Sequence, residues 1–145
     1  RRVIRYAMKH EGGFDRNKLR TWVDEIPDGY ILRPIDRALY DECLQNRAMA
    51  DLVAAFDGKE AYLRYGRGMV ILKGTQIVSG ASSYSRYREG IEIEVDTIEG
   101  ERRRHLARSA SAALILQCLE EGLYPSWDAQ NLASVSLARQ LGYEL

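Results

Sequence analysis

The chain has 145 residues, 46% of them hydrophobic, and its 21 lysine and arginine residues balance 21 aspartate and glutamate residues. This is enough apolar material for one compact core, so we expect a single domain over 1–145; since the chain starts with arginine, we expect both ends to be trimmed. The zero net charge excludes an overall basic field for nucleic acid, and no apolar run approaches the length of a membrane span.

The two cysteines, Cys43 and Cys118, indicate the redox environment in which the protein is expected to function. They form no CxxC pair and have no histidine-rich partner segment, which argues against zinc and against a secreted disulfide scaffold. The sequence also shows no signal peptide. We therefore expect reduced thiols, a cytoplasmic location and no bound metal.

The first part of the chain is predicted to be a helical extension over 1–28. Residues 1–9 are predicted as a helix, which the glycine pair at positions 12 and 13 interrupts. Asp15 is a residue type that caps helix N-termini, so a second helix is predicted to follow it and to end near Pro27.

The middle of the chain is predicted to contain a strand, helices and an antiparallel hairpin. The segment 29–35 is apolar at alternate positions and predicts a strand, after which Asp36 caps a helix. Helices are expected to continue to about Tyr65. The buried run 69–72 and the segment 76–85 then predict the two arms of a hairpin.

The next strand, predicted over 91–96, alternates strictly between apolar and acidic residues. Its apolar face consists of Ile91, Ile93 and Val95, and its acidic face consists of Glu92, Glu94 and Asp96. Three neighbouring carboxylates raise one another's pKa and attract a cationic molecule. The alternative is a half-buried strand with one solvated face.

The segment ERRRHLARSASAALILQ, at 101–117, combines three arginines with a helical pattern that ends at Gly122. A helix N-terminus already carries partial positive charge, so Arg102, Arg103 and Arg104 are unfavourable there without an anion. A strand that leads into such an N-terminus is a typical phosphate site. We expect the arginines to complement an anionic ligand; the alternative is a solvated loop whose arginines contact nearby glutamates.

The C-terminal part is predicted to contain a short strand over 123–127 and a helix over 131–141, which Gly142 caps at its C-terminus. The chain thus has a helix-rich beginning, an antiparallel meander and a strand–helix–strand–helix ending. This order predicts an α+β fold.

Several of these segments resemble the GNAT N-acetyltransferases. RRRHLA, at 102–107, is similar to that family's Gln/Arg-x-x-Gly-x-Gly/Ala pyrophosphate loop, and NLASVSLARQLGY, at 131–143, is similar to its Asn-x-x-Ala/Ser…Leu-Gly-Phe/Tyr helix. The segments SSYSRY, IEIEVDT and CLEEGLYPSWDAQN resemble, more specifically, the zwittermicin A resistance-like branch. With a weaker similarity at the front, the resemblance covers nearly the whole chain.

The resemblance implies the GNAT acyl-CoA N-acyltransferase fold, a mixed and mostly antiparallel sheet flanked by helices, with a V-shaped splay between the fourth and fifth strands. Pro125 lies in the expected fifth strand and suits a neighbour that has already diverged there. Acetyl-CoA would bind in the splay, with its pantetheine chain added to the free strand edge. The implied cofactor-binding residues are Val95, Asp96, Thr97, Arg102, Arg103, Arg104, His105, Leu106, Ala107, Ser109, Asn131 and Ser134.

The sequence departs from the family pattern at two positions. His105 stands where the pyrophosphate loop usually has glycine, so a side chain must fit where the backbone approaches phosphate; a helical φ would be allowed for it. Ala138 stands where many GNAT enzymes carry a tyrosine that protonates the leaving thiolate. Ser134, Tyr124 or water would then have to supply the proton.

Direct acetyl transfer to an amine needs a base for the ammonium proton and donors for the tetrahedral oxyanion. Glu92 lies at about the position of a catalytic glutamate in some GNAT enzymes, so the resemblance makes it the first candidate base and Glu94 the second. A backbone N–H near Val95 or Asp96 is the expected oxyanion donor. The residues expected to contact the acceptor are Tyr84, Trp127 and Asp128, although a tryptophan after a strand is also typical core material.

The sequence therefore predicts a cytoplasmic, bacterial, acetyl-CoA-dependent N-acetyltransferase that acetylates a primary amine by direct transfer in a ternary complex. The expected acceptor is a small molecule, such as an antibiotic, with a protein lysine left open. A non-catalytic acyl-CoA-binding module is the alternative that His105 and Ala138 support. A nucleic-acid-binding domain that uses the Arg102–Arg104 and Arg86–Arg88 patches is opposed by the zero net charge. No membrane partner is expected, and a homodimer is left open.

Overall fold

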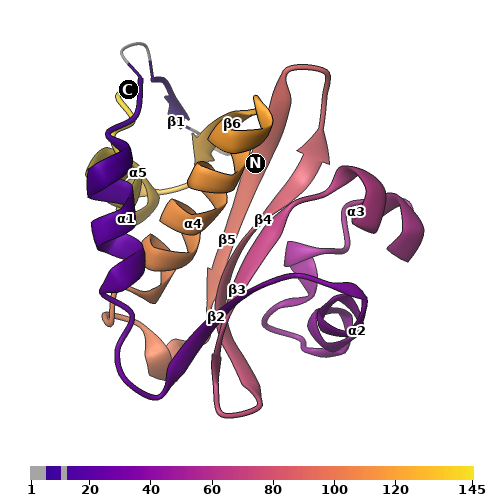
Figure 1. Ribbon diagram of the computed structural model, residues 1–145. Coiled ribbons are helices and arrows are strands. Elements are labelled where there is room, and N and C mark those ends of the chain that lie inside the picture. The colour runs from indigo at the N-terminus through magenta and orange to yellow at the C-terminus, as the bar shows by residue number, and fades with distance from the viewer. Residues whose placement is uncertain (1–5, 11–12) are drawn as a thin grey trace.

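The computed structural model describes residues 6–10 and 13–145 and contains one six-stranded mixed sheet (Figure 1). The strands are β1 (Tyr6–Met8), β2 (Tyr30–Pro34), β3 (Gly68–Lys73), β4 (Gln76–Arg86), β5 (Gly90–Thr97) and β6 (Tyr124–Ala129). They are ordered β1-β6-β5-β4-β3-β2 across the sheet. All neighbouring strands are antiparallel except β5 and β6, which are parallel.

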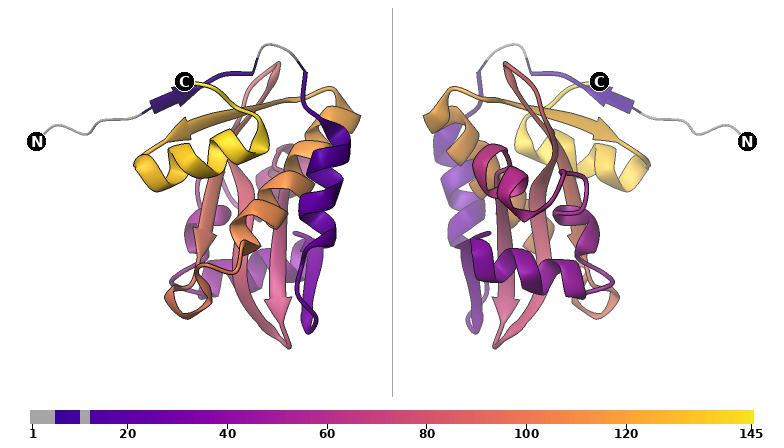
Figure 2. Two further views of the ribbon diagram at one scale, coloured as in Figure 1. Left: turned by 90° about the vertical axis from the view of Figure 1, so that its left-hand side faces the viewer. Right: turned by 90° about the vertical axis from the view of Figure 1, so that its right-hand side faces the viewer.

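Helices cover both faces of the sheet, as Figure 2 shows. The α-helices are α1 (Arg16–Asp24), α2 (Arg37–Gln45), α3 (Lys59–Tyr65), α4 (Leu106–Glu121) and α5 (Leu132–Leu141), and the 3-10 helices are η1 (Ala50–Leu52) and η2 (Glu99–Glu101). The helices α1, α4 and α5 lie on one face, and α2, η1 and α3 lie on the other. Each layer encloses its own hydrophobic cluster against the sheet. The α+β architecture expected from the sequence is confirmed.

The N-terminal prediction was wrong where the structure describes it. Residues 6–8 form β1, not a helix, and pair antiparallel with β6, Tyr6 opposite Ala129 and Met8 opposite Trp127; residues 1–5 lie outside the described part. The physical reason is tertiary: this part of β6 has left β5, so its N–H and C=O groups need another partner. The second predicted helix is confirmed as α1, with the Asp15 side chain accepting a hydrogen bond from the Lys18 N–H at 3.1 Å.

The splay between β5 and β6 is the feature that positions the site. The two strands pair only where Gly90, Ile91 and Glu92 face the start of β6. From Ile93 to Thr97 the β6-facing edge of β5 has no strand partner among residues 6–10 and 13–145. A Cβ atom on Gly90 would lie 2.0 Å from the Tyr124 carbonyl oxygen, so glycine permits the close approach where the V begins.

Pro125 lies in the paired part of β6, opposite Ile91, and not where the strands have diverged as expected. The Tyr124 N–H donates to the Glu89 carbonyl oxygen, so the next nitrogen along the strand points to the other edge of β6. The strand β1 does not extend to that point. The missing N–H of Pro125 therefore removes no ladder hydrogen bond.

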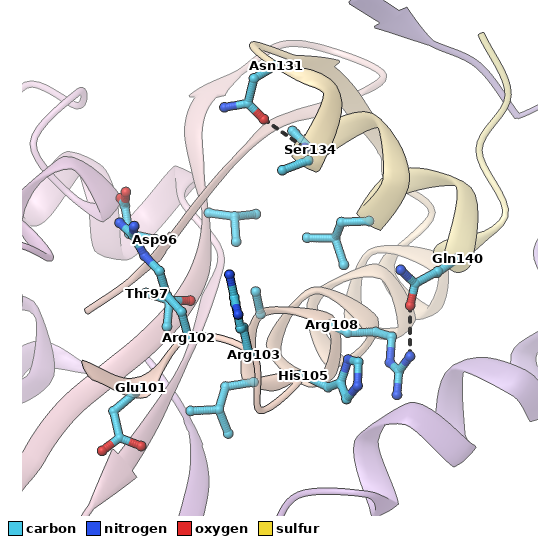
Figure 3. Close-up of a pocket in the computed structure, with 15 residues that line it drawn as sticks. Asp96, Thr97, Glu101, Arg102, Arg103, His105, Arg108, Asn131, Ser134 and Gln140 are labelled. Carbon is cyan, nitrogen blue, oxygen red and sulfur yellow. Dashed lines mark hydrogen bonds between the residues drawn. The ribbon is translucent and has the colours of Figure 1, made fainter. Parts of the chain in front are cut away.

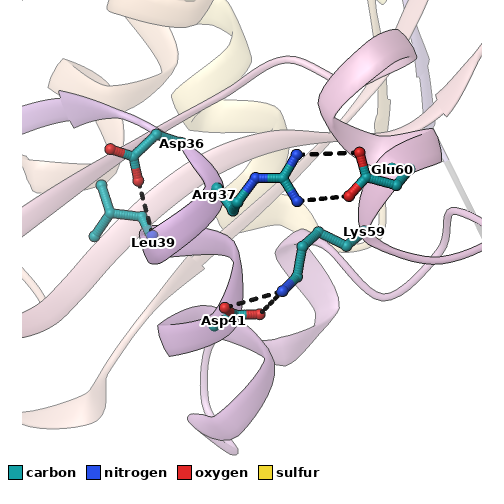
Figure 4. A network of polar contacts seen from close by, with 6 residues as sticks. All are labelled: Asp36, Arg37, Leu39, Asp41, Lys59 and Glu60. Atoms are coloured by element: carbon teal, nitrogen blue, oxygen red, sulfur yellow. Dashed lines mark hydrogen bonds and ion pairs between the residues drawn. The ribbon is translucent and has the colours of Figure 1, made fainter.

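Ion pairs join α2 to α3 on the second face of the sheet (Figure 4). Arg37 contacts Glu60 through two hydrogen bonds, of 2.5 and 3.1 Å, and Lys59 lies 2.8 Å from Asp41. The α2 N-terminus is capped by Asp36, as predicted, with 2.8 Å to the Leu39 N–H. Exposed pairs stabilise a fold little, but these join the two helices that precede and follow η1, which contacts β4 and β5.

Among the described residues, none of the helices combines the length and the apolar character that a membrane span requires.

Candidate functional site

A cleft of about 390 Å³ lies between the free edge of β5, the loop that precedes α4, and α5. Figure 3 shows side chains from all three segments around this space. The cleft is lined by Val95, Asp96, Thr97, Glu101, Arg102, Arg103, His105, Leu106, Ala107, Arg108, Asn131, Ala133, Ser134, Leu137 and Gln140. It thus brings together every residue expected to bind the cofactor except Arg104 and Ser109.

The loop before α4 has an unusual backbone. Arg103 has φ 68° and His105 has φ 60°, both in the left-handed region, and α4 begins only at Leu106. The helical φ considered for His105 is therefore wrong, because the chain reverses its direction between β5 and α4 within this loop. The α4 N-terminus has no side-chain cap, so its first N–H groups are available to an anion in the cleft.

The three arginines of the loop have different roles. Arg102 and Arg103 line the cleft, and Figure 3 shows Arg103 pointing into the space between β5 and α5. Arg104 does not line it: its Nε lies 3.3 Å from Glu101 Oε1. In this structure Arg104 forms an ion pair with the buried Glu101 carboxylate, and its contact with a cofactor stays a prediction.

Glu101 is a buried carboxylate at the lower end of the cleft. The Tyr30 hydroxyl donates to it at 2.5 Å and the Lys73 ammonium at 3.3 Å. The Tyr30 hydrogen bond is the main reason that its pKa lies below the ordinary value, followed by the hydrogen bond from Lys73. Glu101 therefore stays ionised and keeps Arg104 beside the loop, where it stabilises the loop conformation.

Ser109 is corrected. Its side chain is only 2% exposed, and its hydroxyl donates to the Trp22 carbonyl oxygen at 2.6 Å, so it joins α4 to α1 and does not reach the cleft. Sequence reasoning missed Arg108, which lies one residue earlier and does line the cleft. Its guanidinium donates to Gln140 at 2.7 Å and to Glu25 at 2.8 Å.

Two further hollows lie beside the acidic face of β5. One, of about 600 Å³, lies toward η1 and is lined by Asp51, Ala54, Ala55, Tyr84, Glu94, Asp96 and Gln130. The other, of about 230 Å³, lies in the splay and is lined by Ile93, Glu94, Val95, Asp96, Trp127, Asp128, Gln130, Asn131 and Ser134. Asp96 borders both of them and the cleft near α4, so the three spaces meet at this residue.

The Asp96 carboxyl group has a strongly raised pKa, of about 7. Burial is the largest cause, and the neighbouring Glu94 and Asp51 carboxylates add to it, while Arg102 opposes it. The Oδ2 atom is buried and has no hydrogen-bond partner within the described part of the chain. A carboxylate that titrates near neutral pH at the meeting point of three cavities is suited to accept a proton.

Glu92, the first candidate base, lies elsewhere. The Tyr84 hydroxyl donates to its Oε2 at 2.7 Å and the Ser85 hydroxyl to its Oε1 at 2.9 Å. A register shift in β4 between Ser83 and Ser85 allows both neighbours to face this carboxylate. Glu92 borders none of the three cavities, whereas Glu94, the second candidate, borders two.

Of the other residues named from the sequence, some border a cavity and some do not. Tyr84 borders the cavity toward η1, and Trp127 and Asp128 border the splay. Ala138 is fully buried in the core, and the Tyr124 hydroxyl accepts a hydrogen bond from the His10 N–H, away from the cleft. Of the residues named as proton sources, Ser134 is the one that borders the cleft. Within the described part of the chain, no group of side chains is arranged to hold a metal ion.

Comparisons with known proteins show which family and which fold this chain resembles. A family model described as GNAT acetyltransferase matches residues 1–145. The crystal structure of a GCN5-related N-acetyltransferase-like protein from Streptococcus suis has a TM-score of 0.96 and 50% sequence identity, over 99% of this chain and 58% of that one. An uncharacterized N-acetyltransferase of Bacillus subtilis, YdfB, is 27% identical over 122 residues, which are 83% of this chain and 46% of that protein.

The chain therefore spans about half the length of these two relatives. A more distant structure is that of an aminoglycoside acetyltransferase from an uncultured soil metagenomic sample, in complex with sisomicin. It has a TM-score of 0.58 and 14% identity, over 79% of this chain and 88% of that one, which indicates a shared fold alone.

Proposed function

The chain belongs to the GNAT acetyltransferase family, and on this basis we propose that it transfers the acetyl group of acetyl-CoA to a primary amine of a small molecule. The transfer is direct, in a ternary complex of protein, acetyl-CoA and acceptor. One observation carries the proposal: the splay of β5 and β6 joins a cleft with anion-binding groups to an acidic cavity, and Asp96 lies where they meet.

The residues of the cleft fit acetyl-CoA. The free edge of β5 from Val95 to Thr97 offers backbone groups to the pantetheine amides. Arg102, Arg103 and the uncapped α4 N-terminus offer positive charge and N–H donors to a pyrophosphate. When bound, acetyl-CoA supplies an activated thioester. The residues that line the cleft would hold it so that its acetyl end lies in the splay.

The acceptor is a cationic amine. The cavity toward η1 carries the Asp51, Glu94 and Asp96 carboxylates, and Ala54 and Ala55 leave it wide. Negative charge in a recessed cavity attracts ammonium groups. The proposed membership in the zwittermicin A resistance-like branch and the shared fold of an aminoglycoside acetyltransferase both support a small amine such as an antibiotic.

In the proposed reaction, Asp96 takes the proton that the acceptor nitrogen must lose before or during attack. The negative charges of Glu94 and Asp51 contribute by raising the pKa of Asp96, so that its carboxyl group can accept and release a proton near neutral pH. Backbone N–H groups on the free edge of β5, near Val95 and Asp96, stabilise the oxyanion. Glu92 supports the site indirectly, by holding Tyr84 at the wall of the acceptor cavity.

A non-catalytic acyl-CoA-binding module is the second candidate. The observation that favours it is the buried Ala138, which leaves the position of the usual tyrosine acid without a polar group. Such a module would keep the cleft and its arginines but would need no base at Asp96.

Two measurements on the same protein separate these functions. Calorimetric titration with acetyl-CoA should give saturable binding at one site per chain for both candidates. Turnover of acetyl-CoA with a panel of polyamines, aminoglycosides and lysine peptides should then appear only for the enzyme. Absence of acetyl-CoA binding would reject both candidates, and tight binding without turnover on any acceptor would favour the binding module.

A further inference from the structure

A hydrogen bond between one residue of β6 and one residue of α5 orients a hydroxyl group at the splay. Trp127 on β6 is only 4% exposed, and its indole Nε1–H donates to Ser134 Oγ on α5 at 3.2 Å. The Ser134 backbone N–H in turn donates to the Asn131 side chain at 2.8 Å, which caps α5. Figure 3 shows this capping contact beside the cleft. The indole thus contacts the hydroxyl directly, while the cap fixes the backbone of the residue that carries it.

The direction of this hydrogen bond decides what the hydroxyl can do next. An indole N–H can only donate, so Ser134 Oγ is the acceptor and its own proton remains for another partner. No described residue accepts a hydrogen bond from that hydroxyl. Because Ser134 borders both the cleft near α4 and the hollow in the splay, its proton is available to a ligand that passes from one to the other.

The tryptophan that orients Ser134 is itself rigid. Its backbone pairs with Met8 on β1, and its ring lies 5.4 Å from the Tyr143 ring. The Tyr143 hydroxyl donates to the Pro125 carbonyl oxygen at 2.5 Å. A buried indole N–H usually has a hydrogen-bond partner, and here the partner is a side chain that faces the cleft rather than a backbone carbonyl.

We propose that Trp127 is a positioning residue that orients the Ser134 hydroxyl as a hydrogen-bond donor to the sulfur of the departing CoA thiolate. This inference rests on the proposed function, because the sulfur must lie where the cleft meets the splay. The position of Ser134, one turn before Ala138 on α5, lets it serve where the usual tyrosine is absent.

The step balances without a proton leaving Ser134. A C–N bond forms between the acceptor nitrogen and the acetyl carbon, and the C–S bond breaks with its electron pair on sulfur. An acceptor that arrives as an ammonium ion loses two protons: Asp96 takes one of them, and the other passes to water as the neutral amide forms. The thiolate later takes a proton from water. Ser134 keeps its proton and stabilises the negative charge on sulfur, as preorganised donors do for developing anions.

Thiolate titration of bound CoA tests the inference without turnover. We expect the thiol pKa of bound CoA to lie about one unit lower in the wild type than in Ser134→Ala, which corresponds to one charge-assisted hydrogen bond. Trp127→Phe, which keeps an aromatic ring but loses the N–H, should remove most of the same shift. Ser134→Thr keeps a hydroxyl and should restore it. Thermal unfolding of each variant shows whether the fold is retained.

Kinetics provide the second readout. Each single substitution should lower kcat by about 10- to 100-fold with little change in KM for the acceptor, and the double variant should be no slower than Ser134→Ala. Equal thiol pKa values in wild type and Ser134→Ala would overturn the inference. The inference would also be overturned if folded Trp127→Phe lowered the thiol pKa of bound CoA as much as the wild type does. Trp127 would then contribute only to the hydrophobic core. Absence of turnover in all proteins, with the thiol shift present, would reject acetyl transfer and with it a departing thiolate, and would keep only the hydrogen bond from Ser134 to the sulfur of bound CoA.

Discussion

The Tyr84 hydroxyl donates a hydrogen bond to Glu92 Oε2 at 2.7 Å, and this contact separates Glu92 from the cavities on either side of β5. With Ser85 bound to its other oxygen, Glu92 offers little to an incoming amine. Asp96, four residues further along the same face of the strand, has a buried oxygen without a partner among the described residues. We therefore propose Asp96, rather than Glu92, as the base.

Replacing this carboxylate should slow the chemistry selectively. Asp96→Asn should lower kcat by about 10²- to 10⁴-fold, the usual cost of a lost general base, while the Kd of acetyl-CoA changes little. Glu92→Gln is the matched control, with the same change from carboxylate to amide on the same strand face. Steady-state kinetics on one acceptor would contradict the assignment if Glu92→Gln were the slower variant.

The pH dependence follows from the raised pKa of Asp96, about 7. Since the base must be ionised, kcat/KM should rise with pH through about 7. A carboxyl whose pKa is raised on folding stabilises the protein below its unfolded pKa and loses that stability as pH rises through its folded pKa. Thermal unfolding should thus show Asp96→Asn gaining stability over wild type at pH 8 but not at pH 4. If Asp96→Asn changed the stability equally at pH 8 and pH 4, this would argue against ionisation of a buried Asp96 carboxyl group between these pH values.

The arginine loop should bind the pyrophosphate through two of its three arginines. Replacing Arg102 and Arg103 together with alanine should weaken CoA binding by about 1 to 3 kcal/mol, the range for charge-assisted hydrogen bonds. Arg104→Ala serves as the control and should weaken it much less, because Arg104 contacts Glu101. Calorimetry at two salt concentrations measures both effects. Equal losses in the two variants would show that Arg104 also contacts the ligand.

The left-handed conformation of His105, at φ 60°, makes glycine a better fit. His105→Gly should raise the free energy of unfolding by up to about 1 kcal/mol, because glycine adopts this φ without steric cost and loses part of that gain through chain entropy. CoA affinity should stay the same or increase. If instead His105→Gly bound CoA more weakly than the wild type, and this difference grew as the pH fell through about 6.5, the imidazole would be identified as a phosphate ligand.

The size of the acceptor cavity should depend on the small residues beside η1. Ala55→Phe would fill part of the cavity toward η1 and should raise KM for a bulky aminoglycoside more than for a short alkylamine. The Kd of acetyl-CoA should be unaffected, because Ala55 does not border the cleft near α4. Ala48→Phe is the matched control, because it makes the same change at an exposed alanine that borders none of the three cavities, and it should change neither KM. A uniform rise in KM for both amines would argue against a size filter.

Local patterns predicted most of the fold. The caps at Asp15 and Asp36, and the closing Gly142, lie at helix ends as the sequence indicated, because capping depends on neighbouring residues alone. The strand β1 was missed, since a three-residue strand has no periodicity to detect and forms only where β6 lacks another partner.

The site was predicted less completely than the fold. Sequence motifs located the cleft, because strand, loop and helix are consecutive there. They could not rank the carboxylates of β5, since the shift in β4 that turns Tyr84 and Ser85 toward Glu92 is a property of strand pairing. Arg108 was missed because its partners, Glu25 and Gln140, come from distant parts of the chain. The bond from Trp127 to Ser134 likewise required the positions of β6 and α5.

The central claim is direct transfer to an amine at the splay, and the most direct test is the initial rate of CoA release at varied acetyl-CoA and acceptor concentrations. The account predicts release only when an acceptor amine is present, acetylated amine in equal amount, and intersecting double-reciprocal lines typical of a ternary complex. Saturable acetyl-CoA binding with no acceptor-dependent release across the amine panel would contradict it.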